Sequence, residues 1–248
     1  PWLRNRAGRS AIASRERSLS MLVAFVYVCL EDSRVWLKQK VKTTKLFLHR
    51  SLTIRLSIDN SGRNSRLGHL FSTYFNVDKD QKKKLIWFHA VSVGELNSII
   101  PILEELNNKY KDLEFLITTT TISSSNIFKK EFRKINNARH RFFPIDVLFL
   151  VKKFLKLWSP KLIFFVDSEI WPNLLFEAKR SKIPLALINA RVTSKTAKRW
   201  MKFQKPAKKI FSLFNFCLVA NLETKNFLNE LNVNNLFYNG NIKLINSI

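Results

Sequence analysis

Beyond residue 84 the chain alternates short, wholly apolar runs with longer stretches of helical periodicity, and this alternation limits the possible folds more than any other feature. Such alternation is typical of βαβ units and a parallel sheet. Strands that are apolar throughout are covered on both faces. The sequence therefore predicts an α/β fold, a Rossmann-like doubly wound parallel sheet. Strands are expected at 85–91, 114–119, 139–144, 162–166, 184–189, 216–220 and 236–238.

Helical patterns fill the gaps between these strands. The stretch 147–158 carries its apolar residues at a 3.6-residue period, which is the signature of an amphipathic helix. A long basic stretch at 194–213 is also expected to be helical, with an interruption at Pro206. Ser123 is interpreted as a helix cap. Further helices are expected at 95–106, from 123 onward, at 172–180 and at 222–231.

The start of this regular pattern sets the expected domain limits. Residues 81–245 are predicted to form the Rossmann-like domain, and residues 21–80 a basic arm with membrane-proximal amphipathic helices. Residues 1–20 show no clear pattern and are set apart as a leader without an assigned role. The apolar run 21–30 follows several arginines but is shorter than the ~18 residues of a membrane-spanning helix. It is interpreted as a membrane-surface anchor, or else as an ordinary amphipathic helix packed on the domain.

The charge balance points to an anionic neighbour. The chain holds 43 Lys and Arg against 18 Asp and Glu, a formal net charge of +25. This excess suits an anionic membrane face, a phosphorylated substrate or nucleic acid, and a lysine-rich coding bias is the alternative. No nucleic-acid-binding motif is present, so a nucleic-acid partner is not expected. Cys29 and Cys217 are interpreted as buried apolar residues, and the histidines show no zinc spacing, so neither a metal nor a cofactor is predicted.

Polar and ionisable residues follow the predicted strands at their carboxyl ends, where ligands bind in doubly wound sheets. Glu95 and Glu169 each follow one strand, and Arg191 follows another. Helix capping is the competing explanation for such residues, and a proton-accepting carboxylate is the functional one. For Glu95 both interpretations stay open on these grounds. Gly94 lets a ligand approach the backbone at a helix N-terminus, which favours an anion.

Several of these segments together resemble the signature motifs of Kdo (3-deoxy-D-manno-octulosonic acid) transferases. The resemblance runs over about residues 60–245, in the family order. The matching segments are His89-Ala90-Val91-Ser92-Val93-Gly94-Glu95, Ser168-Glu169-Ile170-Trp171-Pro172-Asn173, Ile188-Asn189-Ala190-Arg191, Gly240-Asn241-Ile242-Lys243 and, upstream, Arg66-Leu67-Gly68.

The resemblance implies the N-terminal, acceptor-binding half of a two-domain GT-B glycosyltransferase. It implies that Glu95 is the general base that deprotonates the 6'-hydroxyl of the acceptor's glucosamine, and that Glu169 is a second active-site carboxylate. His89 and Trp171 are interpreted as structural residues. The expected substrate-binding residues are Ser92, Gly94, Thr119, Asn173, Arg191, Asn241 and Lys243. The alternative for Arg191 is a buried salt bridge.

The family's activity would be transfer of Kdo from CMP-Kdo to a lipid A precursor, with inversion, in lipopolysaccharide biosynthesis. The expected place is the cytoplasmic face of the bacterial inner membrane, with the lipid A precursor and the anionic membrane surface as partners. Asp167 and Ser168 stand where the family usually has Glu and Thr. The sequence stops at Ile248, soon after the last motif, so the donor domain is expected to be absent or a separate partner. A non-catalytic acceptor- or membrane-binding module is the alternative function, and a nucleic-acid-binding protein is the less favoured one.

Overall fold

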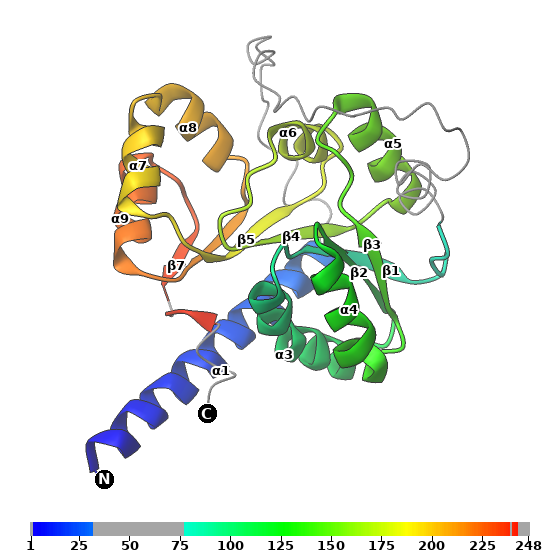
Figure 1. Ribbon diagram of the computed structural model, residues 1–248, viewed down its shortest axis with the longest axis horizontal. Helices are drawn as coiled ribbons and strands as arrows, with labels where there is room; N and C mark the ends of the chain where they lie inside the picture. Colours follow the sequence, from blue (N-terminus) through cyan, green and yellow to red (C-terminus); the bar gives the residue numbers. More distant parts are fainter. Residues whose placement is uncertain (1, 32–76, 239, 243–248) are drawn as a thin grey trace.

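The computed structural model describes residues 2–31, 77–238 and 240–242, and Figure 1 shows them as a single parallel sheet between two layers of helices. The upstream motif Arg66-Leu67-Gly68 and Lys243 lie outside the described residues. The strands are β1 (Lys84–His89), β2 (Leu113–Thr119), β3 (Ala138–Phe142), β4 (Leu162–Val166), β5 (Leu185–Ala190), β6 (Phe216–Val219) and β7 (Leu236–Tyr238). The helices are α1 (Trp2–Glu31), α3 (Val93–Lys109), α4 (Ile122–Glu131), α5 (Leu148–Trp158), α6 (Pro172–Arg180), α7 (Ser194–Met201), α8 (Gln204–Phe211) and α9 (Leu222–Glu230), with a 3-10 turn at Phe132–Lys134.

The seven strands lie in the order β3-β2-β1-β4-β5-β6-β7, and every neighbouring pair is parallel. The chain winds outward in one direction from β1 through β2 to β3, and in the other direction from β4 to β7. The order therefore reverses between β1 and β4, which is where ligands bind in this class of fold. The predicted doubly wound, Rossmann-like sheet is confirmed.

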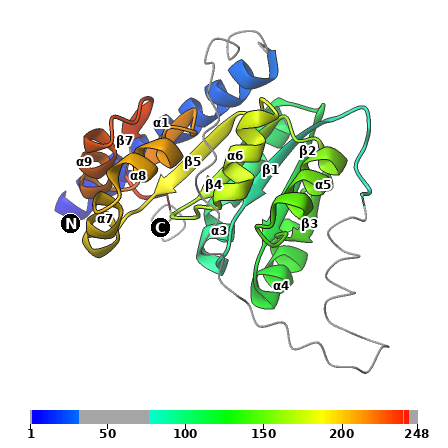
Figure 2. The same cartoon turned by 90° about the horizontal axis from the view of Figure 1, so that it is seen from above.

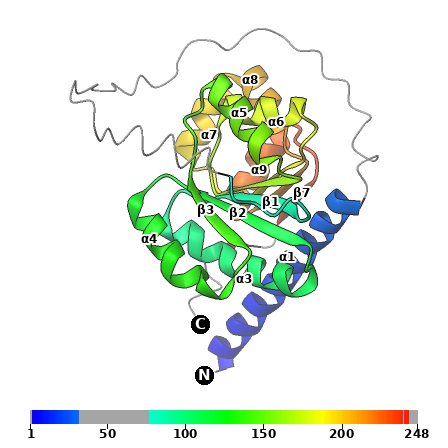
Figure 3. The same cartoon turned by 90° about the vertical axis from the view of Figure 1, so that its right-hand side faces the viewer.

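Two apolar clusters cover the two faces of the sheet, as the continuous apolar strands require. One cluster joins Trp87 and Phe165 of the sheet to α5, α6, α8 and α9. The other joins Phe88 and Phe164 to α1 and α3. Figure 3 shows α1, α3 and α4 on one side of the sheet and α5 and α6 on the other, and Figure 2 looks down on this second layer.

Helix α1 packs its C-terminal half against the sheet. Leu22 and Val26 are fully buried there, and the Phe25 ring stacks on Phe216 with ring centroids 4.8 Å apart. The apolar run 21–30 thus contributes to the domain's own core, as the second of the two interpretations expected. One continuous helix crosses the boundary that the sequence suggested at residue 20. Among the described helices, none combines the length and the apolar character that crossing a membrane would need.

The basic stretch 194–213 forms two helices, but the break falls before the proline. Helix α7 ends at Met201, and Phe203 precedes α8, so Pro206 lies in the first turn of α8. A proline in the first turn removes no intrahelical hydrogen bond, so it does not break the helix there. The cap expected at Ser123 is likewise displaced, because Thr121 is the N-cap of α4 and accepts from the Ser124 backbone N–H.

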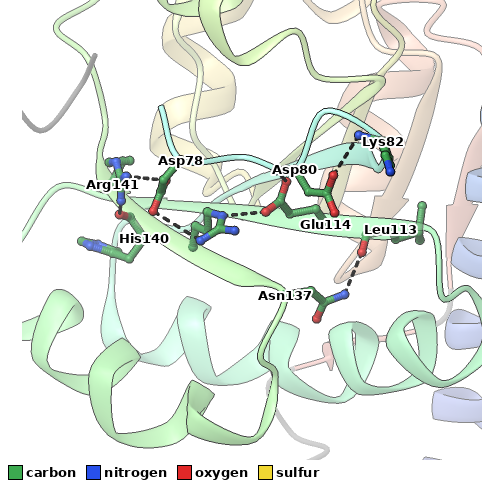
Figure 4. Close-up of polar contacts among 9 residues, drawn as sticks. Asp78, Asp80, Lys82, Leu113, Glu114, Asn137, His140 and Arg141 are labelled. Carbon is green, nitrogen blue, oxygen red and sulfur yellow. Dashed lines mark hydrogen bonds and ion pairs between the residues drawn. The ribbon is translucent and has the colours of Figure 1, made fainter. Parts of the chain in front are cut away.

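An ion-pair network fixes residues 77–83 across the edge of the sheet (Figure 4). Glu114 of β2 is 1% exposed; it accepts from Arg139 Nε at 2.5 Å and from the Asp80 backbone N–H at 2.9 Å. Asp78 pairs with Arg139 at 3.3 Å and with Arg141 at 2.6 Å. The Arg139 guanidinium of β3 and the Asp80 backbone N–H of the segment before β1 therefore satisfy the buried carboxylate, and the segment enters β1 from a fixed position.

Candidate active site

Glu95 lies in the first turn of α3 and takes part in a capping box. Ser92 is the N-cap: its Oγ accepts from the Glu95 backbone N–H at 3.3 Å and donates to Glu95 Oε1 at 2.9 Å. The other carboxylate oxygen accepts from the Val91 backbone N–H at 2.8 Å. Two donors thus orient a side chain that is only 7% exposed. The structural role of Glu95 is established by these contacts, and they also hold its carboxylate at the reversal point of the sheet.

Glu169 follows β4 and faces the same point. Its Oε2 accepts from Trp171 Nε1 at 2.9 Å. Burial, followed by the negative charge of Glu95, raises the pKa of Glu169 to about 7. The Trp171 hydrogen bond opposes this rise, and the charge of Asp167 adds to it. Glu95 and Glu169 therefore form an interacting pair in which Glu169 holds its proton up to neutral pH, which is the range useful for proton transfer.

His89 lies beneath this pair, at the end of β1, and is fully buried. Burial lowers the pKa of His89 to about 3, so the ring is neutral at physiological pH. Its Nδ1 lies 2.9 Å from Thr118 Oγ1. Its Nε2 has no hydrogen-bond partner in the described part of the chain, and it lies 3.9 Å from Glu169 Oε2. Since a neutral imidazole carries no charge, this contact is not a salt bridge.

The ends of β4 and β5 have an unusual backbone. Asp167 and Asn189 both adopt the left-handed conformation, at φ 64° and φ 55°, which Asn and Asp tolerate better than other non-glycine residues. Asn189 Nδ2 donates to Asp167 Oδ1 at 2.5 Å, and Asn189 Oδ1 accepts from the Ile242 backbone N–H at 3.0 Å. These contacts bring the Gly240-Asn241-Ile242 segment back to the carboxyl edge of the sheet.

The expected substrate-binding residues fall into two groups, and the first group lies at least partly exposed to solvent. Gly94 is exposed, and a Cβ built on it would meet no atom within 4 Å. Arg191 is also exposed, and no carboxylate of the described residues pairs with its guanidinium. The alternative interpretation, that Arg191 forms a buried salt bridge, is wrong, because Arg191 is exposed on the surface. Asn241 is half-buried at the same edge.

The second group is already engaged within the protein. Ser92 is used in the capping box. Thr119 is fully buried, and its Oγ1 lies 2.9 Å from His140 Nε2, so it is not free to meet a ligand in this structure. Asn173 binds the Asp146 backbone oxygen through Nδ2 at 2.6 Å, while the Asp146 carboxylate accepts from the Asn173 and Leu174 backbone N–H groups. Asp146 therefore caps α6, a helix distant from it in sequence.

Three residues of the site have roles that sequence reasoning missed. Trp171 packs on Phe143 as a core anchor would, with ring centroids 4.7 Å apart, and also binds Glu169. His89 was interpreted as a structural residue and Asn189 only as a member of a matching motif, yet the contacts of each with a neighbouring strand or segment were not foreseen. For His89 and Asn189 the available signal was a polar residue at or next to the last position of an otherwise apolar strand. The described residues contain no group of three His, Cys, Asp or Glu side chains arranged to hold a metal ion.

We expect the substitution Glu169→Gln to stabilise the domain at alkaline pH. Folding raises the pKa of Glu169 from 4.5 to about 7, so the folded state disfavours the ionised form. Stability from this residue is therefore lost as pH rises from about 4.5 to 7, and the penalty is complete above pH 7. Because the side chain is 24% exposed, the penalty is taken as about 2 kcal/mol.

Urea unfolding of wild type and Glu169→Gln at pH 4.5 and pH 8 measures this difference. The variant should be more stable than wild type at pH 8 and equal to it at pH 4.5. Glu105→Gln, an exposed position in α3, is the matched control and should change neither value. Equal effects of Glu169→Gln at the two pH values would show that the carboxyl does not titrate with a raised pKa.

Comparisons with known proteins agree with the motifs at this edge of the sheet. The family model described as 3-deoxy-D-manno-octulosonic-acid transferase (kdotransferase) matches residues 63–246. The 3-deoxy-D-manno-octulosonic acid transferase of Rickettsia felis is 37% identical over 170 residues, which are 68% of this chain and 36% of that protein. The Rickettsia typhi protein of the same description is 32% identical over 233 residues, 94% of this chain and 46% of that protein.

The chain therefore spans between about a third and a half of the length of these curated relatives. Among solved structures, the UDP-GlcNAc 2-epimerase of Neisseria meningitidis aligns with a TM-score of 0.46 and 16% identity, over 65% of this chain and 47% of that one. The family match covers both carboxylates of the site and all of the sheet. This chain belongs to the 3-deoxy-D-manno-octulosonic-acid transferase (kdotransferase) family.

Proposed function

We propose that this chain is the acceptor-binding half of an inverting glycosyltransferase that transfers Kdo from CMP-Kdo to a lipid A precursor in lipopolysaccharide biosynthesis. The observation that carries the proposal is the position of Glu95. Its carboxylate is held by two donors at the N-terminus of α3, beside Glu169 and next to the open space above Gly94. A hydroxyl group that enters this space would meet a fixed proton acceptor.

In the proposed reaction, Glu95 takes the proton of a glucosamine hydroxyl of the acceptor. The hydroxyl oxygen forms a bond to the anomeric carbon of Kdo, and the bond from that carbon to the phosphate of CMP breaks, so CMP leaves with the electron pair. Attack from the face opposite the leaving group inverts the anomeric centre. Glu169 contributes a second carboxyl whose raised pKa lets it hold a proton near neutral pH. The donor would be bound mainly by a second domain, as the family's two-domain architecture implies.

The basic surface of α7 and α8 supports the proposal that the partners are a phosphorylated acceptor and an anionic membrane. Helices α7 and α8 and the turn between them carry basic side chains and no acidic ones, and Phe203 in that turn is 66% exposed. The basic residues are Lys195, Lys198, Arg199, Lys202, Lys205, Lys208 and Lys209. We propose that this surface docks on the cytoplasmic face of the bacterial inner membrane, with a strength that falls as salt rises.

Vesicle binding tests the proposed acceptor. We expect the chain to bind anionic vesicles that contain a tetra-acylated, bis-phosphorylated lipid A precursor more tightly than vesicles of equal charge without it. The difference should persist at moderate salt, because specific contacts are screened less than the general attraction. Duplex DNA of matched charge is the comparison for a nucleic-acid partner. Equal binding to all three, lost together in salt, would contradict an acceptor site.

The substitution Gly94→Ala tests acceptor binding without lowering the stability of the fold. The added methyl group meets no atom of the described protein, and Ala favours a helix over Gly by about 1 kcal/mol. We expect the variant to be as stable as wild type or more so, and to lose the preference for precursor vesicles about tenfold, because the methyl group occupies the ligand's space. Unchanged preference in a folded variant would place the acceptor away from Gly94.

A further inference from the structure

His89 is the buried polar side chain whose hydrogen bonds the proposed reaction leaves unexplained. The ring lies against Phe143, with ring centroids 3.9 Å apart, and Phe165 and Trp171 approach it edge-on with centroids 6.0 Å away. Its exposed fraction is 0%, so it does not touch a ligand directly. Any effect of His89 on the chemistry must therefore pass through a neighbouring side chain.

The contacts of Thr118 bear on which ring nitrogen of His89 carries the proton. Trp87 Nε1 is a donor only, and it donates to Thr118 Oγ1 at 2.8 Å. The Thr118 hydroxyl proton needs an acceptor of its own, and His89 Nδ1 lies 2.9 Å from the same oxygen. A hydroxyl oxygen can also accept a second hydrogen bond, and the Thr118 backbone carbonyl raises the pKa of His89 as an acceptor, so an Nδ1–H is the competing tautomer. The tautomer in which the hydroxyl donates to Nδ1 places the proton of the neutral ring on Nε2.

The Nε2 atom of His89 lies near Glu169. Nε2 lies 3.9 Å from Glu169 Oε2, the oxygen that also accepts from Trp171 Nε1 at 2.9 Å. No other partner for Nε2 is present in the described ranges. A buried donor without an acceptor is unfavourable, and a shift of about 1 Å would bring these two atoms within hydrogen-bonding distance. Catalytic hydrogen bonds that are long without substrate often tighten in the complex.

We propose that His89 is a positioning residue, whose Nε2–H donates to Glu169 Oε2 and, with Trp171 Nε1–H, fixes this carboxylate so that its second oxygen faces the acceptor site. The effect of this positioning of Glu169 on Kdo transfer rests on the proposed function, whereas the hydrogen bond between His89 and Glu169 does not. A donor to the ionised carboxylate stabilises that form. His89 therefore opposes the groups that keep Glu169 protonated.

The groups that act on Glu169 come from four elements. His89 approaches from the end of β1 and Trp171 from the start of α6, and both offer N–H donors. Glu95 approaches from α3, and Asp167 stands at the end of β4; both are carboxylates that raise the pKa of Glu169. The balance between these donors and these charges decides whether Glu169 is ionised when an acceptor binds.

The first test reads the tautomer of His89 in the unmodified chain. Imidazole nitrogen chemical shifts, measured by NMR on ¹⁵N-histidine-labelled protein, distinguish a protonated from an unprotonated ring nitrogen. The His89 signals are identified by their loss in His89→Gln. We expect a neutral ring protonated on Nε2 across pH 5–8. A ring protonated on Nδ1 would overturn the proposal, because Nε2 would then have no proton to donate.

The second test uses two variants that each keep one half of the imidazole's hydrogen bonds. The amide of His89→Gln reaches the place of Nε2 and can donate to Glu169, whereas that of His89→Asn reaches only the place of Nδ1 and can bind Thr118. Carboxyl ¹³C shifts of Glu169 against pH give its pKa in each protein. We expect His89→Asn to raise the pKa of Glu169 by about one pH unit, and His89→Gln to leave it near the wild-type value.

A purely structural role for His89 predicts a different pattern. A structural role needs only the hydrogen bond to Thr118, which the Asn side chain can keep. His89→Asn would then leave the pKa of Glu169 at the wild-type value, and that result would overturn the proposal. These measurements use no acceptor and no donor. Failure of the vesicle experiment with the expected NMR results would remove the proposed function and leave the positioning of Glu169 by His89 intact.

Discussion

Glu95→Gln is expected to abolish most Kdo transfer when this chain acts together with a donor-binding half. General-base catalysis contributes about 10²–10⁴-fold to rate, and a neutral amide cannot take the acceptor's proton. The fold should tolerate the change, because the Gln oxygen can still accept from the Val91 N–H while its NH₂ group donates to Ser92 Oγ. The measurement is the transfer rate at saturating acceptor and donor, beside a urea unfolding curve.

Two variants of α3 control this experiment. Glu105→Gln makes the same chemical change at an exposed position of the same helix and should leave the transfer rate unchanged. Ser92→Ala removes the helix cap, at a cost in stability of about 1 kcal/mol, and one of the two donors to Glu95, but it keeps the carboxylate and its Val91 N–H donor. A Glu95→Gln enzyme that keeps more than a third of the wild-type rate would rule out Glu95 as the base.

The largest expected loss of stability comes from Trp87→Ala. Trp87 is 0% exposed in β1, where its ring lies 4.9 Å from Phe154 and 6.1 Å from Phe143 between centroids, and its Nε1 donates to Thr118. Truncating such a side chain creates a cavity and costs about 3–5 kcal/mol. That is a large part of the ~5–15 kcal/mol that holds a typical domain folded. Urea unfolding, followed by circular dichroism, measures the change.

Phe203→Ala is the matched control for this loss. Phe203 is also a large aromatic residue, but it is 66% exposed, and its truncation should change the free energy of unfolding by less than about 0.5 kcal/mol. A Trp87→Ala variant that loses under about 1 kcal/mol would show that Trp87 is not part of a close-packed core. Since Trp87 also binds Thr118, the pKa values of His89 and Glu169 should be followed in the same protein.

The apolar pattern predicted the fold because each strand of this sheet is buried on both faces. The five runs from Leu85 to Phe216 that become β1, β2, β4, β5 and β6 contain almost no surface positions, so strand and helix alternate visibly in the sequence. The pattern was weakest at β3, an edge strand whose central Arg139-His140-Arg141 segment is half-buried and tied to Asp78 and Glu114. The apolar pattern of the sequence thus predicts where strands and helices lie, whereas the residue at which a helix begins or ends depends on individual capping side chains.

The motifs predicted the carboxylates of the site but not their contacts. Glu95 makes local hydrogen bonds that a capping-box pattern can indicate. In contrast, the cap of α6 comes from Asp146, on another connection, and the environment of Glu169 comes from His89 and Glu95 on distant segments. Such contacts arise from tertiary packing, so one sequence does not reveal them. The burial of Thr119 against His140 could not be read from a strand end for the same reason.

The most direct test of this account is where the phosphorylated glucosamine disaccharide of the precursor binds on this chain. Backbone amide shifts are followed by NMR as the disaccharide, without acyl chains, is added to the protein. The account predicts that the largest shifts lie at Ser92–Glu95, at Ser168–Trp171 and near Arg191, and that Gly94→Ala removes them. Shifts confined to the basic surface of α7 and α8, unchanged by Gly94→Ala, would contradict an acceptor site beside Glu95 and Glu169.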